Sequence, residues 1–165
     1  MLNNRLRAFF LPTLNRKFFI RAVLVAALAF LVFRFFLIPF RIHGLSMAPT
    51  YSNGQVNFCN TLRYAFSPPD RYDIVAVRMA GRSVMLLKRV VAVAGETVAF
   101  ENGELRINGR KLEEPYITYD YDWTLPPRQV KPDHVYVVGD NRRVPMKAHH
   151  FGQTPVNRIV GAPLW

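Results

Sequence analysis

Residues 84–93 read VMLLKRVVAV, and eight of these ten side chains are apolar. A short continuous run rich in valine and leucine predicts a buried strand. Residues 74–77, IVAV, form a second run of the same kind, and residues 79–82 lie between the two. Lys88 stands inside the first run, so we expect apolar surroundings that penalise its charged form and lower its pKa.

Further strand signals follow along the chain. Asn102-Gly103 and Asn108-Gly109 predict two-residue hairpin turns, because both turn positions need a positive φ. Residues 104–107, between the two turns, alternate polar and apolar side chains. Residues 134–138 predict another buried strand, and residues 158–160 a last one.

Prolines mark the loops. Residues 68–70 read PPD and residues 124–127 read TLPP, and both stretches predict chain reversals or irregular connections. Long helical periodicity is absent after residue 41. The sequence therefore predicts a mainly β domain.

The first forty residues are of a different kind, since they are apolar and basic. Residues 20–40 supply 21 residues, close to the roughly 20 that a helix needs to cross about 30 Å of hydrocarbon. Arg21 and Arg34 interrupt the run; Arg21 can snorkel, and Arg34 must reach the outer headgroups or thin the bilayer. The predicted organisation is a basic cytoplasmic N-terminus at 1–19, a transmembrane helix at 20–40 and an exported β-rich domain at 41–165.

A cleavable leader is the alternative reading of this segment, because leaders also have a basic start and a short apolar core. Ala27-Leu28-Ala29 is a small-x-small pattern, but it lies inside the apolar run rather than after it. A retained anchor is therefore favoured. Four basic residues and no acid precede the span, which places the N-terminus in the cytoplasm and everything after Phe40 outside. The expected location is therefore a membrane whose inner side faces the cytoplasm.

The charge of the chain divides in the same way. Of the net charge of +11, six units come from residues 1–40, and the remaining 16 basic and 11 acidic residues leave the domain at +5. Basic residues beside a membrane helix are explained by anionic lipid, so nucleic acid is not an expected partner. Cys59 is alone, so it cannot form a disulfide within the chain.

Ser46 is the candidate nucleophile. It lies in residues 44–50, GLSMAPT, just after the apolar segment, and Lys88 follows 42 residues later. A serine hydroxyl needs a base to take its proton, and a lysine that burial keeps neutral can act as that base. At a reference pKa of about 10.4, only about one lysine in 2,500 is neutral at pH 7.

Five blocks together resemble the type I signal peptidases, which are membrane-anchored proteases that remove leader peptides. The match follows the family's order after an N-terminal anchor, and it covers the anchor and nearly all of the exported domain. The matching blocks are residues 44–50, residues 71–75 (RYDIV), residues 88–91 (KRVV) with 95–98 (GETV), residues 139–142 (GDNR) and residues 151–152 (FG).

The resemblance implies roles for particular residues. Ser46 is the nucleophile and Lys88 the general base, and the backbone N–H of Ser46 serves the oxyanion. The residue two positions before the nucleophile, which carries a hydroxyl in some members, is Gly44 here. By the same analogy Met47 packs against Lys88, the substrate subsites are Ile42, His43, Gly44, Met47, Tyr51, Leu86 and Leu87, and a structural block near the site is Gly139, Asp140, Asn141 and Arg142.

One segment departs from the family. Residues 145–149 read PMKAH, where the family usually has Ser-x-Asp-Ser-Arg. Pro145 replaces the serine that commonly hydrogen-bonds the lysine, and Lys147 and His149 replace an Asp–Arg pair. Either another group orients Lys88, or apolar packing alone holds it; we favour packing.

The four histidines offer competing chemistry. His149 and His150 are adjacent, but no nearby spacing supplies the further ligands that a metal needs, so neither metal nor cofactor is expected. His43 precedes Ser46 by three residues and His134 begins a strand, but a histidine-based triad leaves Lys88 without a role.

The leading hypothesis is an anchored serine endopeptidase that cleaves leader peptides after small-x-small motifs, with those peptides and the lipid bilayer as its partners. An extended leader would pair with a strand edge, and shallow apolar pockets would admit small side chains. The alternatives are a specialised relative that matures one substrate such as a conjugative pilin, a mitochondrial inner-membrane peptidase, and a catalytically silent anchored binding module.

Overall fold

A computed structural model describes residues 14–78, 85–119, 121–149 and 151–165. The chain divides into two compact units, residues 1–37 and residues 38–165. The predicted connection at residues 79–82, and Val84 at the start of the predicted strand, lie outside the described residues.

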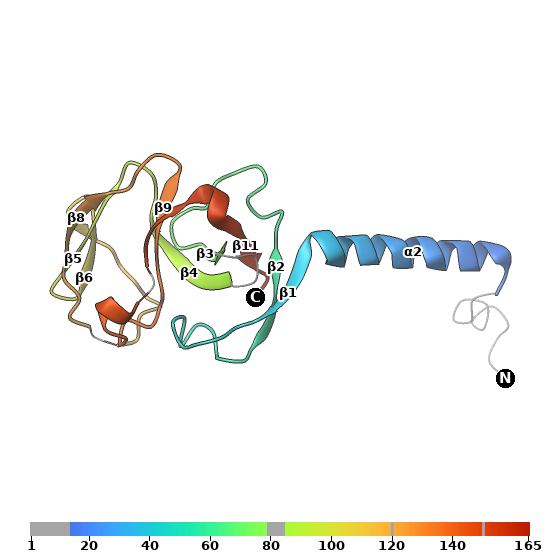
Figure 1. Cartoon of the computed structure of the whole chain (residues 1–165), viewed down its shortest axis with the longest axis horizontal. Coiled ribbons are helices and arrows are strands. Elements are labelled where there is room, and N and C mark those ends of the chain that lie inside the picture. Colours follow the sequence, from blue (N-terminus) through green and yellow to red (C-terminus); the bar gives the residue numbers. More distant parts are fainter. Residues whose placement is uncertain (1–13, 79–84, 120, 150) are drawn as a thin grey trace, which may run out of the picture. The chain divides into compact units, whose positions relative to one another are not determined.

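The first unit contains helix α2, Arg16–Phe35 (Figure 1). The side chain of Asn15 caps its start by accepting a hydrogen bond of 2.8 Å from the Phe18 N–H, which supplies one of the partners that the first turn lacks. Twenty residues at 1.5 Å each give a length of about 30 Å. The helix buries none of its residues within the protein and is long and apolar enough to cross a membrane.

The helix differs from the predicted span of residues 20–40 at both ends. It begins four residues earlier at its asparagine cap, and Leu37–Arg41 form strand β1 instead of a last helical turn. Pro39 gives the reason, because proline lacks the N–H that a helix interior needs and disfavours helical backbone in the residue before it.

The second unit is mainly β, as predicted, and contains two sheets. The larger has the order β1-β2-β11-β3-β4-β9-β10, and its described pairs are antiparallel. Its further strands are β2 (Val56–Asn60), β3 (Ile74–Arg78), β4 (Met85–Ala92), β9 (His134–Val138), β10 (Gly152–Pro155) and β11 (Ile159–Pro163). Two short 3-10 helices, η1 (Met146–Ala148) and η2 (Val156–Arg158), flank β10.

The smaller sheet has the order β7-β6-β5-β8 and lies at the opposite end of this unit from β2 and β11 (Figure 1). Its strands are β5 (Thr97–Glu101), β6 (Glu104–Ile107), β7 (Arg110–Lys111) and β8 (Leu125–Gln129). Both predicted hairpin turns form, with φ of 49° and 79° at Asn102 and Gly103 and 51° and 76° at Asn108 and Gly109.

The prediction of a loop at residues 124–127 is wrong for most of that stretch, because β8 begins at Leu125. Pro126 and Pro127 are tolerated since β8 is an edge strand that pairs only with β5. The pairing register also shifts between Val98 and Phe100, opposite the prolines. The two prolines of this stretch therefore indicate an edge strand and not a loop.

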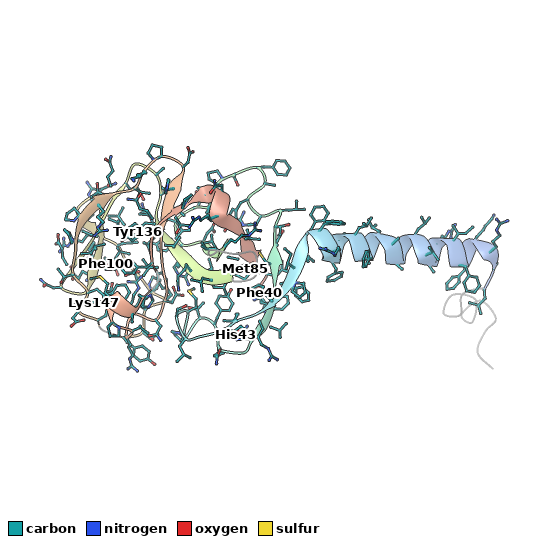
Figure 2. All side chains as sticks on the ribbon, viewed as in Figure 1. Phe40, His43, Met85, Phe100, Tyr136 and Lys147 are labelled. Atoms are coloured by element: carbon teal, nitrogen blue, oxygen red, sulfur yellow. The ribbon has the colours of Figure 1, made fainter. Side chains whose placement is uncertain are left out.

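Three apolar clusters stabilise the unit. The largest lies between the two sheets and includes Phe100 of β5 and Tyr136 of β9, both labelled in Figure 2. A second contains Ile42, Met47, Tyr51, Cys59, Ala76 and Leu87. The third, which we call the valine face, contains Val75, Val77, Val90, Val135 and Val137 from β3, β4 and β9.

Candidate active site

Ser46 lies in a turn that follows β1 and returns the chain to β2. Ile42 and Gly54 close the base of this loop, because the Ile42 N–H donates to Gln55 O at 2.8 Å and the Gly54 N–H donates to Ile42 O at 2.8 Å. Ser46 itself is half-buried. Within the described part of the chain, no acceptor takes its backbone N–H, so this donor is available to a bound group.

Lys88 lies in β4 and exposes only 3% of its surface. Its cross-strand partner in β3 is Val75, so its side chain shares a face with that residue, and the valine face surrounds it. Burial lowers the pKa of Lys88 to about 8, although the negative charge of Asp140 acts in the opposite direction. The apolar environment predicted for this lysine is present.

Gly139 is the residue at which the serine loop and the lysine strand meet. β4 pairs with β9 so that Arg89 faces Val138. Gly139 directly follows Val138 at the end of β9, next to the part of β4 that carries Lys88 and Arg89. A Cβ at Gly139 would lie 2.3 Å from the Ser46 carbonyl oxygen, so this position has no room for a side chain. The serine loop therefore packs against the end of β9, which pairs with the part of β4 that contains Lys88 and Arg89.

Hydrogen bonds fix the loop in this place. The Asn141 N–H donates to Ser46 O at 3.0 Å, and the Asn141 side-chain amide donates to Leu45 O at 3.0 Å. The hydroxyl of Thr50 donates to Asp140 Oδ2 at 2.5 Å. Residues 139–142, expected to be structural, thus hold both ends of the serine loop.

Arg89 lies on the opposite face of β4 from Lys88 and pairs with Asp140. Its Nε and Nη2 donate to the two carboxylate oxygens at 2.9 and 2.6 Å, its Nη1 donates to the Tyr72 carbonyl, and its guanidinium lies 3.9 Å from the centre of the Tyr116 ring. Burial alone lowers the pKa of Arg89, but hydrogen bonding and the charge of Asp140 outweigh it, and the net shift is upward.

Arg142 connects this block to the smaller sheet. Its Nε donates to Gly139 O at 2.9 Å, and its two terminal nitrogens donate to Glu114 at 2.6 and 3.2 Å. The side chain is fully buried among the rings of Phe100, Tyr121 and Trp123. Sequence reasoning missed Glu114 as the partner, since it lies 28 residues away in a stretch without a motif.

Residues 145–149, the segment that differs from the family pattern, end beside Gly139. Pro145 and Lys147 are exposed, whereas His149 is buried. The His149 Nε2 lies 2.7 Å from Asn141 O, and the ring packs edge-on against Trp123 with centroids 4.9 Å apart. A Cβ on Gly139 would also approach His149, at 2.7 Å. His149 thus contacts the block that holds the serine loop.

The seven predicted subsite residues divide into groups. Ile42, Met47, Tyr51 and Leu87 are buried together in the second apolar cluster, on the Arg89 face of β4. Leu86 is half-buried on the Lys88 face, where it lines a cavity with the lysine. His43 and Gly44 are exposed in the loop after β1, where Figure 2 labels His43.

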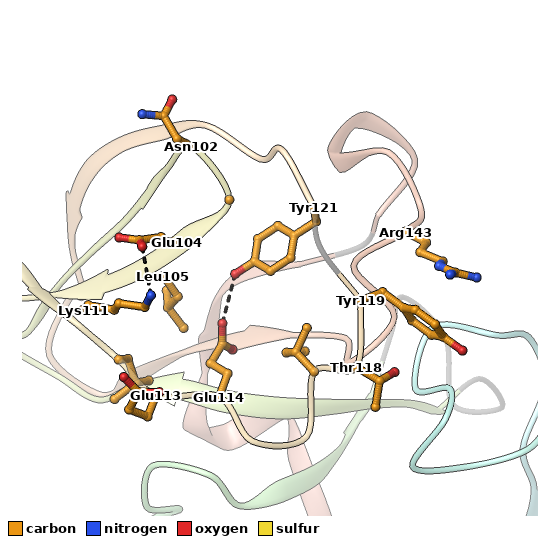
Figure 3. Close-up of a pocket in the computed structure, with 13 residues that line it drawn as sticks. Asn102, Glu104, Leu105, Lys111, Glu113, Glu114, Thr118, Tyr119, Tyr121 and Arg143 are labelled. Atoms are coloured by element: carbon orange, nitrogen blue, oxygen red, sulfur yellow. Dashed lines mark hydrogen bonds and ion pairs between the residues drawn. The ribbon is translucent and has the colours of Figure 1, made fainter.

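A cavity of about 870 Å³ lies in the smaller sheet (Figure 3), and neither Ser46 nor Lys88 lines it. Its charged walls compensate one another, since Lys111 bonds Glu104 at 2.9 Å, while the Tyr121 hydroxyl and Arg142 bond Glu114. Arg143 covers the ring of Tyr119. No group of three metal-ligating side chains occurs in the described ranges.

The chain combines a membrane-length helix with a β domain. In that domain a serine loop packs near a strand with a buried lysine of lowered pKa. An anchored Ser–Lys hydrolase is expected to have these features. Comparisons with known proteins give the family. The family model described as signal peptidase, peptidase S26, matches residues 15–164. The chain belongs to this family, and it is a peptide hydrolase of the signal peptidase type anchored to a membrane.

Two bacterial relatives agree with this assignment in sequence. Signal peptidase I of Bacillus caldolyticus is 32% identical over 157 residues, which cover 87% of this chain and 84% of that protein. Signal peptidase I V of Bacillus subtilis (strain 168) is 29% identical over 161 residues, covering 89% and 95%. A crystal structure of a signal peptidase I from Enterococcus faecalis V583 is 28% identical, covers 57% of this chain and 95% of that chain, and superposes with a TM-score of 0.47.

Proposed function

We propose that this chain removes leader peptides from exported proteins, with Ser46 as the nucleophile and Lys88 as the general base. One observation supports this most strongly: burial lowers the pKa of Lys88 in β4 to about 8, and the Ser46 loop packs against Gly139 at the end of β9, the strand that pairs with β4. With a pKa of about 8, about one lysine in ten is neutral at pH 7, which is about 250 times the neutral fraction of an exposed lysine.

In the proposed reaction, Lys88 Nζ takes the proton of Ser46 Oγ as the oxygen attacks the scissile carbonyl. The tetrahedral oxyanion accepts a hydrogen bond from the Ser46 N–H, which has no internal acceptor among the described residues. The ammonium of Lys88 then gives its proton to the leaving amine, and an acyl ester remains on Ser46. Lys88 next takes a proton from a water molecule that attacks the ester, and its ammonium returns that proton to Ser46 Oγ as the C–O bond breaks and the new carboxylic acid leaves.

We propose that the leader binds as an extended chain beside the second apolar cluster. The apolar side chains of this cluster are almost fully buried, so a subsite formed on their exposed edge would be shallow and would admit only small side chains, in keeping with small-x-small motifs; the residues are Ile42, Met47, Tyr51 and Leu87. His43, Gly44 and Leu86 complete the proposed set around Ser46.

We also propose that the N-terminus is cytoplasmic and that residues 41–165 face outward from a bacterial plasma membrane. Arg16 and Lys17 stand in the first turn of α2 with no acid in that turn, as the positive-inside rule requires. A reporter fused after Trp165 should be active in the exported compartment, and activity confined to the cytoplasm would reverse the topology.

The catalytic roles are tested with the purified full chain and a peptide that carries an Ala-x-Ala leader. Ser46→Ala and Lys88→Ala should each reduce kcat/KM by about 10⁴-fold or more, because the two groups act as a unit. Ser52→Ala, an exposed serine of the same loop, and Lys131→Ala, an exposed lysine, are the matched controls.

The pH dependence adds a second readout. In the wild type, kcat/KM should rise about tenfold per pH unit and level off above about pH 8, as Lys88 loses its proton. Cleavage within tenfold of wild type in either Ser46→Ala or Lys88→Ala would contradict the assignment. No cleavage by the wild type would favour the silent binding module.

A further inference from the structure

A second cavity opens directly beside Lys88. It has a volume of about 210 Å³, and Lys88 forms part of its wall together with Val77, Leu86 and Val137 on the same face of the sheet. None of the loop residues 44–50 lines it. The cavity therefore lies on the side of Lys88 away from the serine loop.

Two arginines give this cavity its charge. Arg78 ends β3 and Arg158 ends η2, and both also line the cavity. Both are exposed, and neither has an ion-pair partner among the described residues. Among the described residues, no acidic side chain lines the cavity. The wall next to Lys88 is therefore a cationic surface that the described part of the protein does not neutralise.

The proposed mechanism indicates which residues of a bound substrate would lie next to this cavity. Lys88 must give its proton to the amine that leaves, so the departing segment has to emerge at the lysine. The acyl half stays bonded to Ser46 on the other side. The first residues after the scissile bond are thus the part of the chain that the cavity can receive.

Resting on the proposed function, we infer that this cavity is a subsite for an acidic side chain within the first three residues after the cleavage site. Its volume suits one side chain rather than a folded partner, its apolar wall contacts the methylenes of Asp or Glu, and Arg78 and Arg158 pair with the carboxylate. The enzyme thereby reads the start of the mature protein as well as the end of the leader.

The test uses peptides with one leader and Glu, Gln or Lys placed in turn at the first, second and third positions after the bond. At one of these positions the wild type should cleave the Glu peptide about tenfold faster in kcat/KM than the Lys peptide, with Gln between them. Salt should reduce this ratio, because the arginines are exposed. Arg78→Gln with Arg158→Gln should bring the ratio close to one, and Arg158→Glu should favour Lys.

Arg110→Gln, on the short strand β7, is the matched control and should keep the wild-type ratio. Equal rates for Glu and Lys peptides at all three positions in the wild type, or an unchanged ratio in the double variant, would overturn the inference while leaving leader cleavage intact. If the wild type cleaves none of the peptides, the proposed function is wrong, and the inference fails with it.

Lipid headgroups are the competing partner for two exposed arginines. The same variants are therefore assayed in phosphatidylcholine vesicles with and without phosphatidylglycerol. If the subsite is correct, the Glu-to-Lys ratio is the same in both vesicles. If the double variant instead loses only a stimulation by phosphatidylglycerol, the arginines bind lipid and the subsite is wrong.

Discussion

Lys88 and Arg89 are neighbours in β4, but their side chains lie on opposite faces of the strand, and their pKa values shift in opposite directions. Both side chains are largely buried. Arg89 faces Asp140, Tyr72 and Tyr116, which keep it charged. Lys88 faces valines, and its pKa falls to about 8.

The difference teaches that burial alone does not decide the protonation of a cation. A paired and hydrogen-bonded cation stays charged, whereas a cation on an apolar face becomes a base. Alternation along one strand places a charged, paired arginine and a lysine of lowered pKa one residue apart. Asp140 acts on both, because it bonds Arg89 and partly offsets the desolvation of Lys88.

The strongest way to break this comparison is to make the two cations alike. Lys88→Arg should reduce kcat/KM at least about 10³-fold, because a guanidinium with a pKa above 12 cannot accept the serine proton. Arg89→Lys is the reciprocal change and should retain far more activity, since it alters a supporting pair. Leader-peptide cleavage and thermal unfolding of both variants measure the two effects. Comparable activity in the two variants would contradict the assignment of the base.

Removing the counter-ion tests the Arg89 face. Asp140→Asn leaves a buried guanidinium without its carboxylate and should lower the free energy of unfolding by about 3–5 kcal/mol. It should also weaken the hold on the serine loop through Thr50. Urea unfolding of the full chain in detergent gives the measurement, and the exposed Asp122→Asn serves as control. A loss below about 1 kcal/mol would mean that the pair behaves like a surface salt bridge.

A smaller, opposite change is expected on the Lys88 face. Burying the charged lysine costs about 3 kcal/mol below pH 8, so Lys88→Met should stabilise the fold by about 2–3 kcal/mol at pH 7. Between pH 8 and the unfolded value near 10.5, the folded chain releases the proton first, so the wild type gains stability as pH rises. The advantage of methionine should therefore shrink toward pH 10.5. An advantage that stays constant from pH 7 to 10 would show that lysine ionisation is not its cause.

Much of this comparison follows from sequence. The apolar run around Lys88 predicts its burial, and the strands at 74–77, 104–107 and 134–138 follow from side-chain pattern and turn chemistry. The strand at Leu125–Gln129 does not, because edge position depends on which strands pair, and sequence alone does not reveal that.

The supporting contacts of the site are also hidden from sequence reasoning. The residues of the GDNR block are recognisable, but nothing local shows that Gly139 is small because a serine carbonyl lies against it. The partnership of Glu114 with Arg142 depends on how two sheets pack, and so does the contact of His149 with Trp123. Long-range packing of this kind leaves no periodic signal in either partner.

The edges of the smaller sheet have a consequence for how extended chains dock. A free sheet edge captures any passing strand, and a peptidase that acts on extended peptides would be inhibited by substrate held in the wrong place. One edge, β7, is two residues long, exposed and doubly basic. The other, β8, places two prolines without N–H donors in a row. Both edges of the smaller sheet therefore disfavour the binding of an extended peptide as an additional strand. Such a peptide is then more available to bind at the larger sheet.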